Sequence, residues 1–126
     1  ASPNAGFTTG TPWIRVNPNY KEINAAACTA DPDSVFHYYQ ELIRLRHTLR
    51  IIVYGKFEGL LEDSETIYAY QRLLDGQVLT VACNFTDQEQ ACDLCEDPAA
   101  RELISNYKTH KTGTLQPYEA RVILQK

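Results

Sequence analysis

The sequence predicts a mainly β protein, in which an antiparallel Greek-key β-sandwich follows an irregular loop and one amphipathic helix. Residues 1 to about 30 are rich in Pro, Gly, Asn and Thr and show no sustained period of 2 or 3.6. Residues 32–49 carry apolar side chains at spacings of three and four. From residue 51 onward, β-branched and aromatic residues alternate with polar ones between turn signals. These changes predict two parts, residues 1–50 and a β-sandwich over 51–126.

Composition narrows the class of protein. The 126 residues suit one ordinary domain, and 12 Lys and Arg against 16 Asp and Glu give a net charge of -4 without any block of like charge. Nucleic acid and anionic membranes are therefore not expected as partners. No apolar run approaches the ~20 residues that a membrane-spanning helix needs. Because the chain opens with Ala and not Met, we expect it to begin inside a longer protein.

The four cysteines fit a reducing, cytoplasmic compartment better than a disulfide scaffold. Cys92 and Cys95 form a CxxC pair, but a second pair at zinc-site spacing is missing, so neither a metal nor another cofactor is expected. The roles of Cys28, Cys92 and Cys95 are left open. The sequon Asn84-Phe85-Thr86 follows a strand that looks central, and we interpret it as a coincidence.

The helix over 32–49 has clear start signals, with Asp31 as the expected N-cap and Pro32 at the first helical position. Its apolar stripe needs a surface to lie against, so a chain without that surface is expected either to self-associate through the 32–49 helix or to shift its N-terminal segment. The stripe consists of Val35, Tyr38, Tyr39, Leu42, Leu45 and Leu49.

The clearest β element is a hairpin centred on Asp75-Gly76, a pair suited to a type I′ turn because both positions tolerate positive φ. Further strands are expected near residues 56–62, 89–94, 101–106 and 118–125. Tyr68 and Tyr70 alternate on one predicted strand, which favours cross-strand packing. The alternative is an independent carbohydrate-binding module, in which exposed aromatic rings stack on sugars.

Several segments resemble a known family. They include Asn4-Ala5-Gly6-Phe7-Thr8-Thr9-Gly10-Thr11-Pro12-Trp13-Ile14, Val16-Asn17-Pro18-Asn19-Tyr20 and, near the end, Pro117-Tyr118-Glu119-Ala120. This chain resembles glycoside hydrolase family 13, in the group of oligo-1,6-glucosidases, α-glucosidases, dextran glucosidases and trehalose-6-phosphate hydrolases. The resemblance runs through essentially the whole chain.

The resemblance implies that residues 1–50 are the last loop and last helix of a (β/α)8 barrel and that the sandwich follows them. It implies a parent enzyme that releases glucose from α-linked oligosaccharides with retention of configuration, and an upstream barrel as partner. The family's catalytic motifs lie on earlier barrel strands, so we expect no catalytic residue here and an inactive isolated chain. From their place in the loop, Phe7, Trp13, Asn17 and Tyr20 are candidates for the rim of the substrate cleft or for bracing it.

No pair of carboxylates in the sequence suggests catalysis of its own. A retaining glycosidase needs two carboxyl groups ~5 to 5.5 Å apart. Glu58 and Glu62 would share a strand face, but four residues of extended chain place their backbones roughly 13 Å apart. His37, His47 and His110 lack a metal-binding spacing. The sequence does not predict which α-linkage the parent enzyme cleaves.

Overall fold

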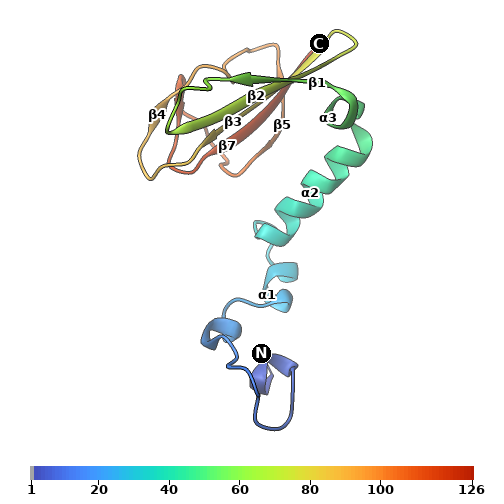
Figure 1. Cartoon of the computed structure of the whole chain (residues 1–126), viewed down its shortest axis with the longest axis vertical. Coiled ribbons are helices and arrows are strands. Elements are labelled where there is room, and N and C mark those ends of the chain that lie inside the picture. The colour runs from blue at the N-terminus through green and yellow to red at the C-terminus, as the bar shows by residue number, and fades with distance from the viewer. Residues whose placement is uncertain (1) are drawn as a thin grey trace. The chain divides into compact units, whose positions relative to one another are not determined.

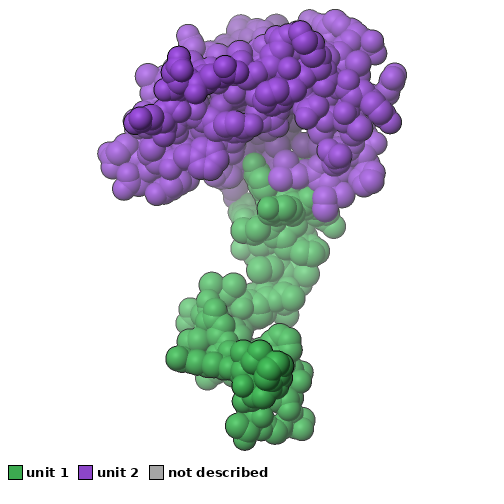
Figure 2. Space-filling model, in the orientation of Figure 1, with its two compact units in different colours: residues 1–41 green, residues 42–126 purple. Residues whose placement is uncertain are grey.

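A computed structural model describes residues 2–126, which divide into two compact units, one that ends at residue 41 and one over residues 42–126 (Figure 2). Two 3-10 turns and three α-helices come first: η1 (Pro3–Gly6), η2 (Pro18–Lys21), α1 (Ala25–Ala30), α2 (Val35–Thr48) and α3 (Arg50–Tyr54). Seven strands follow: β1 (Lys56–Leu60), β2 (Ile67–Leu74), β3 (Gln77–Asn84), β4 (Gln90–Ala91), β5 (Arg101–Ser105), β6 (Thr114–Leu115) and β7 (Ala120–Gln125) (Figure 1). No helix within residues 2–126 is long and apolar enough to cross a membrane.

The first thirty residues contain more local structure than the expected loop. Asparagine side chains hold its turns: Asn17 Oδ1 accepts a hydrogen bond from the Asn19 amide at the start of η2, and Asn24 Oδ1 accepts one from Ala27 at the start of α1. Helix α1 forms because an Ala-rich run follows that Asn24 cap.

The long helix begins later than predicted, at Val35, and Asp31 is not its N-cap. Asp31 ends α1, and its carboxylate accepts a hydrogen bond from the Asp33 amide at 2.9 Å, which forms a local turn. Ser34 instead accepts the first helical hydrogen bond, from the Tyr38 amide. A turn that uses the Asp31 side chain removes it as a cap for α2.

The region from residue 51 does not become β at once, because α3 intervenes between α2 and β1. The chain leaves the helical conformation at Leu49 (φ -107°, ψ 105°) and re-enters it at Arg50. Ile51 is 1% exposed and belongs to the same apolar cluster as Leu79 and Leu124 of the sheet. Burial of this side chain therefore favours a helical turn over an extended start.

The sandwich is built on a five-stranded antiparallel sheet in the order β1-β2-β3-β7-β5. The Asp75-Gly76 hairpin is confirmed, since it joins β2 to β3 with φ of 50° and 77° at its two turn residues. The strand expected over 89–94 is reduced to β4, which pairs with the unpredicted β6 in a two-stranded sheet. Strand β7 starts only after Tyr118, whose φ of 55° interrupts an extended backbone.

Apolar clusters cover both faces of the five-stranded sheet. On one face, α3 packs on Leu79 and Val81. On the other, Ala82 and Ile123 pack against the segment that carries β4 and β6. The predicted fold class, a mainly antiparallel β domain preceded by helical segments, is confirmed.

Replacement of Ile51 by Ala should lower the free energy of unfolding by about 3 kcal/mol, because it leaves a cavity beneath α3. Urea unfolding followed by circular dichroism measures this loss. Val53→Ala, on the same helix but 41% exposed, is the control and should cost less than about 1 kcal/mol. Equal losses for the two variants would show that α3 is not seated on the sheet through Ile51.

Candidate functional site

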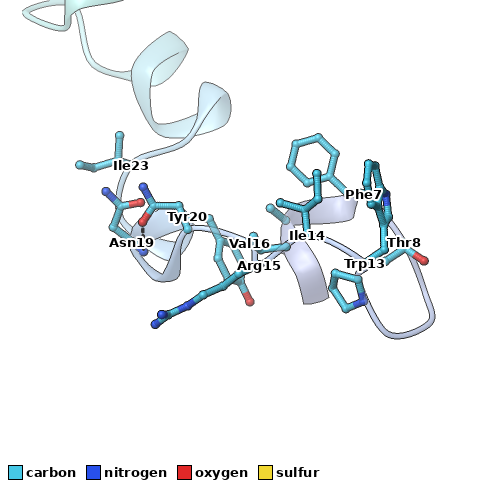
Figure 3. A pocket seen from close by; sticks show the side chains of 12 residues that line it. Phe7, Thr8, Trp13, Ile14, Arg15, Val16, Asn19, Tyr20 and Ile23 are labelled. Atoms are coloured by element: carbon cyan, nitrogen blue, oxygen red, sulfur yellow. Dashed lines mark hydrogen bonds between the residues drawn. The ribbon is translucent and has the colours of Figure 1, made fainter.

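The four predicted rim residues lie together along an open hollow of about 750 Å³ in the N-terminal unit (Figure 3). Phe7 and Trp13 lie towards one end of it and Tyr20 towards the other, and Asn17 is also part of the lining. Phe7 is 83% exposed and Trp13 94% exposed. The structure thus brings the candidates together on one surface and leaves the rings of Phe7 and Trp13 open to contact.

Side-chain hydrogen bonds of Asn4 shape the loop that presents these rings. Asn4 Nδ2 donates to the carbonyl oxygens of Thr8 at 3.1 Å and Gly10 at 3.0 Å, which closes the loop between them. Asn4, Ala5 and Gly6 have φ of 53°, 55° and 81°, so three consecutive residues adopt the left-handed region. The loop is therefore held by hydrogen bonds from one side chain to its own backbone and not by a core.

Asn17 and Tyr20 are each tied into this local framework. The Asn17 side chain caps η2, and the Tyr20 carbonyl oxygen accepts a hydrogen bond from Asn24 Nδ2 at 3.0 Å. Among the residues that line the hollow, Arg15 alone carries a charge. The hollow offers apolar and amide contacts suited to a sugar or a protein surface, and no carboxylate for acid–base chemistry lines it.

The C-terminal unit contains a buried ionic cluster centred on Glu119, which is 0% exposed. The His110 ring lies between two carboxylates, with Nδ1 2.6 Å from Glu119 Oε1 and Nε2 3.0 Å from Glu102 Oε2. Arg121 lies on the same side, with its guanidinium 3.2 Å from Glu96 and 3.6 Å from Glu102. Glu119 Oε2 also accepts a hydrogen bond from the Gln116 amide.

This cluster is suited to holding strands together and not to catalysis. A nucleophilic or proton-transferring carboxylate must reach its substrate, whereas Glu119 is enclosed and its oxygens are engaged by His110 and Gln116. Arg121 also donates to the Cys95 carbonyl oxygen at 3.2 Å, which links β7 to the segment before β5. Its Nε is buried without a hydrogen-bond partner and is held by charge alone.

The CxxC cysteines belong to the apolar core. Cys92 and Cys95 are 8% and 5% exposed in one cluster with Ile67 and Leu115. Burial raises the pKa of the Cys92 thiol and raises that of Cys95 to about 12, so both remain protonated at neutral pH. Across residues 2–126, no group of three or more His, Cys, Asp and Glu side chains could hold a metal ion.

Asn84, the first residue of the sequon, is 3% exposed and fully engaged. Its amide nitrogen donates to the carbonyl oxygens of Gln88 and Gln116, at 2.7 and 2.9 Å, and its carbonyl oxygen accepts from the Thr86 amide at 2.9 Å. In the folded domain this side chain stabilises the turn after β3, and its nitrogen is not accessible for glycan attachment.

Comparison with known proteins divides the chain in the same order as the structure. Residues 1–55 match the family model described as Alpha amylase, catalytic domain. Residues 69–125 match the model described as Beta-galactosidase C-terminal domain.

Curated relatives match almost the whole chain. It is 49% identical to an oligo-1,6-glucosidase of Parageobacillus thermoglucosidasius and 41% identical to a trehalose-6-phosphate hydrolase of Bacillus subtilis, over 96% and 97% of its length. In each case it spans 23% of the relative. The crystal structure of trehalose-6-phosphate hydrolase from Bacillus licheniformis superimposes with a TM-score of 0.88 at 41% identity, over 98% of this chain and 24% of that one. The chain is homologous to the C-terminal region of glycoside hydrolase family 13 enzymes.

Glu119 stands in Pro117-Tyr118-Glu119-Ala120, a segment that resembles family 13, and its ionic cluster was not predicted from the sequence. A signal was present, because Glu119 is in phase with Arg121 and Ile123 and therefore points to the same face of the sheet. Two opposite charges at alternating strand positions that face the interior suggest a buried ion pair. His110 could not be added, because it comes from a loop nine residues away.

Glu119→Gln should lower the free energy of unfolding of this chain by about 2 kcal/mol, since it keeps the side-chain shape but removes the charge that faces His110 and Arg121. Chemical unfolding at neutral pH measures the loss. Glu58→Gln removes a partly exposed pairing with Lys56 and should leave the unfolding midpoint unchanged. If Glu119→Gln were as neutral as Glu58→Gln, the cluster would not stabilise the fold.

Proposed function

We propose that this chain is the non-catalytic C-terminal part of an α-glucosidase-type hydrolase that releases glucose from α-linked oligosaccharides with retention. Its residues support the catalytic barrel and form part of the rim of the substrate cleft. The observation that carries the proposal is the length match: 96% of the chain aligns at 49% identity with 23% of an oligo-1,6-glucosidase. A quarter-length homologue of an enzyme is expected to share its fold and to depend on the rest for chemistry.

The non-catalytic role is supported by the state of the carboxylates. Among the acidic residues within 2–126, only Glu119 is fully buried, and it is enclosed in its cluster. Glu58 pairs with Lys56, and Glu89 pairs with Lys111, both at the surface. None of these arrangements offers two free carboxyl groups on either side of a sugar-binding cleft, as retaining hydrolysis requires.

Exposed apolar side chains on α2 support a role in contact with further polypeptide. Val35 is 70% exposed, Tyr39 61% and Ile43 54%, whereas Leu45 is 5% exposed. Leaving such a surface in water costs free energy, so we expect it to pack on the upstream barrel of the same protein. A chain without that barrel should self-associate through the 32–49 helix. The proposed boundary near residue 50 separates this barrel helix from the sandwich.

We place the parent enzyme in the cytoplasm and assign it no cofactor. All four cysteines are free, and burial keeps Cys83, Cys92 and Cys95 as neutral thiols through raised pKa values. The buried Asn84 amide suits a protein that is not glycosylated at this sequon.

The purified chain should show no hydrolysis of isomaltose, maltose, trehalose 6-phosphate or a chromogenic α-glucoside. A chimera in which these 126 residues replace the matching part of the P. thermoglucosidasius oligo-1,6-glucosidase should regain α-glucosidase activity. Release of glucose measures both outcomes. Turnover at an enzyme-like rate by the isolated chain, or a folded chimera without activity, would contradict the proposal.

The variant Trp13→Ala, made in the same chimera, distinguishes a role of Trp13 at the rim of the substrate cleft from a role in bracing the loop. Because Trp13 is 94% exposed and has few contacts of its own, a rim position should raise KM for isomaltotriose several-fold and change KM for a nitrophenyl glucoside less. Its thermal unfolding temperature should stay constant. A lower unfolding temperature with equal KM values would instead assign Trp13 to bracing.

A further inference from the structure

The loop that presents Phe7 and Trp13 begins with a strained backbone. Asn4, Ala5 and Gly6 adopt the left-handed region one after another, with φ of 53°, 55° and 81°. A residue with a Cβ atom reaches this region only at a cost in free energy, and two such residues stand here side by side. Strained backbone of this kind persists where surrounding interactions determine it, and it gathers at binding sites. An interaction beyond the turn itself must therefore hold these residues.

The Asn4 side chain, which is half-buried, makes that interaction. Its Nδ2 donates both of its hydrogen bonds within the loop, to the carbonyl oxygens of Thr8 at 3.1 Å and Gly10 at 3.0 Å. The Asn4 carbonyl oxygen accepts a further bond from the Phe7 amide at 3.1 Å. The Gly10 amide donates to Thr8 Oγ1 at 3.1 Å and closes the far side. One residue thus ties together the start, the middle and the end of residues 4–10.

The backbone decides where the two rings lie, because no packing holds them. Phe7 is 83% exposed and Trp13 94% exposed, and neither belongs to an apolar cluster within residues 2–126. Phe7 lies inside the closed loop, and Trp13 follows Gly10 after only Thr11 and Pro12. Pro12 fixes its own φ and restricts Thr11 to extended conformations, so this connection is stiff. Both rings lie towards the same end of the hollow as a result (Figure 3).

A purely structural role accounts less well for the Asn4 hydrogen bonds. No described residue before Leu45 is buried, so closure of this loop protects no core in its unit. Hydrogen bonds in an exposed loop add little to global stability, because water competes for the same groups. Holding binding groups in place before a ligand arrives has a different benefit, since it lowers the entropy lost on binding. The bonds of Asn4 are suited to that second purpose.

From this geometry we infer that Asn4 is a positioning residue for substrate binding, an inference that rests on the rim role proposed above. Asn4 acts through the loop and fixes Phe7 and Trp13, which contact sugar units beyond the cleaved bond. A loop already held in shape binds those outer sugars without first becoming ordered. The preference of the enzyme for longer α-linked oligosaccharides over a single glucoside therefore depends on the Asn4 hydrogen bonds.

The test compares Asn4→Asp and Asn4→Gly in the active chimera described above. Both replacements tolerate positive φ, but Asp places an oxygen where Nδ2 donates, and Gly has no side chain at all. Each should raise KM for isomaltotriose about fivefold or more, and should change kcat and the KM for a nitrophenyl glucoside less. Thr29→Ala removes comparable exposed bonds, from Oγ1 to the carbonyl oxygens of Ala25 and Ala26 at 2.9 and 3.1 Å, and should change none of these constants.

A second measurement separates positioning from stability. In a chimera that carries Phe7→Ala and Trp13→Ala, the added Asn4→Gly should change KM for isomaltotriose less than about twofold, because the rings through which Asn4 acts are gone. An undiminished effect in that background would overturn the inference, as would an unchanged KM for Asn4→Gly when both rings are present. Either result leaves the proposed function intact. A folded but inactive chimera without any substitution would contradict the proposed function and the inference with it.

Discussion

The C-terminal unit depends on strand β3 being buried on both faces at once. Leu79 and Val81 point to α3, and Thr80 and Ala82 point to the layer that carries β4 and β6. A strand with two apolar faces has no solvent side, so it must lie in the middle of the sheet and both faces must be covered. The order β1-β2-β3-β7-β5 satisfies this, since β2 and β7 flank β3 and the shorter β1 and β5 form the edges.

Covering the second face of β3 requires polar groups to be buried with it, and this explains the ionic and amide networks. Strands β4 and β6 have only two residues each, so few backbone hydrogen bonds hold this layer. Side-chain hydrogen bonds and ion pairs take the place of those that longer strands would make. Asn84 holds the turn after β3, and Arg121 reaches the Cys95 carbonyl. Because unpartnered polar groups in such a layer are costly, Glu119 and His110 are positioned as partners and not as reagents.

The sequence predicted those features that a local pattern determines. Asp75-Gly76 specified the central hairpin because positive φ at both turn residues is a local requirement. Strand β6 was missed because two residues give no periodicity, and Leu115 is identified as core only by its burial against distant strands. The Asp31 carboxylate could either cap the long helix or form an Asx-turn with the Asp33 amide, and it forms the turn. The sequence alone favours neither of these two uses. The grouping of the rim residues followed from the family resemblance, and no periodicity specified it.

The N-terminal unit contrasts with this domain, because none of its described residues is buried and its turns must be held in another way. No described residue before Leu45 is buried, and the turns around Asn4, Asn17 and Asn24 are closed by hydrogen bonds between side chain and backbone. A segment stabilised in this way can keep its local turns with few apolar contacts. Its exposed aromatic side chains are therefore not needed to hold these turns and are open to contact. Exposed rings held on turns of this kind remain open to contact, which is the property on which the proposed rim role depends.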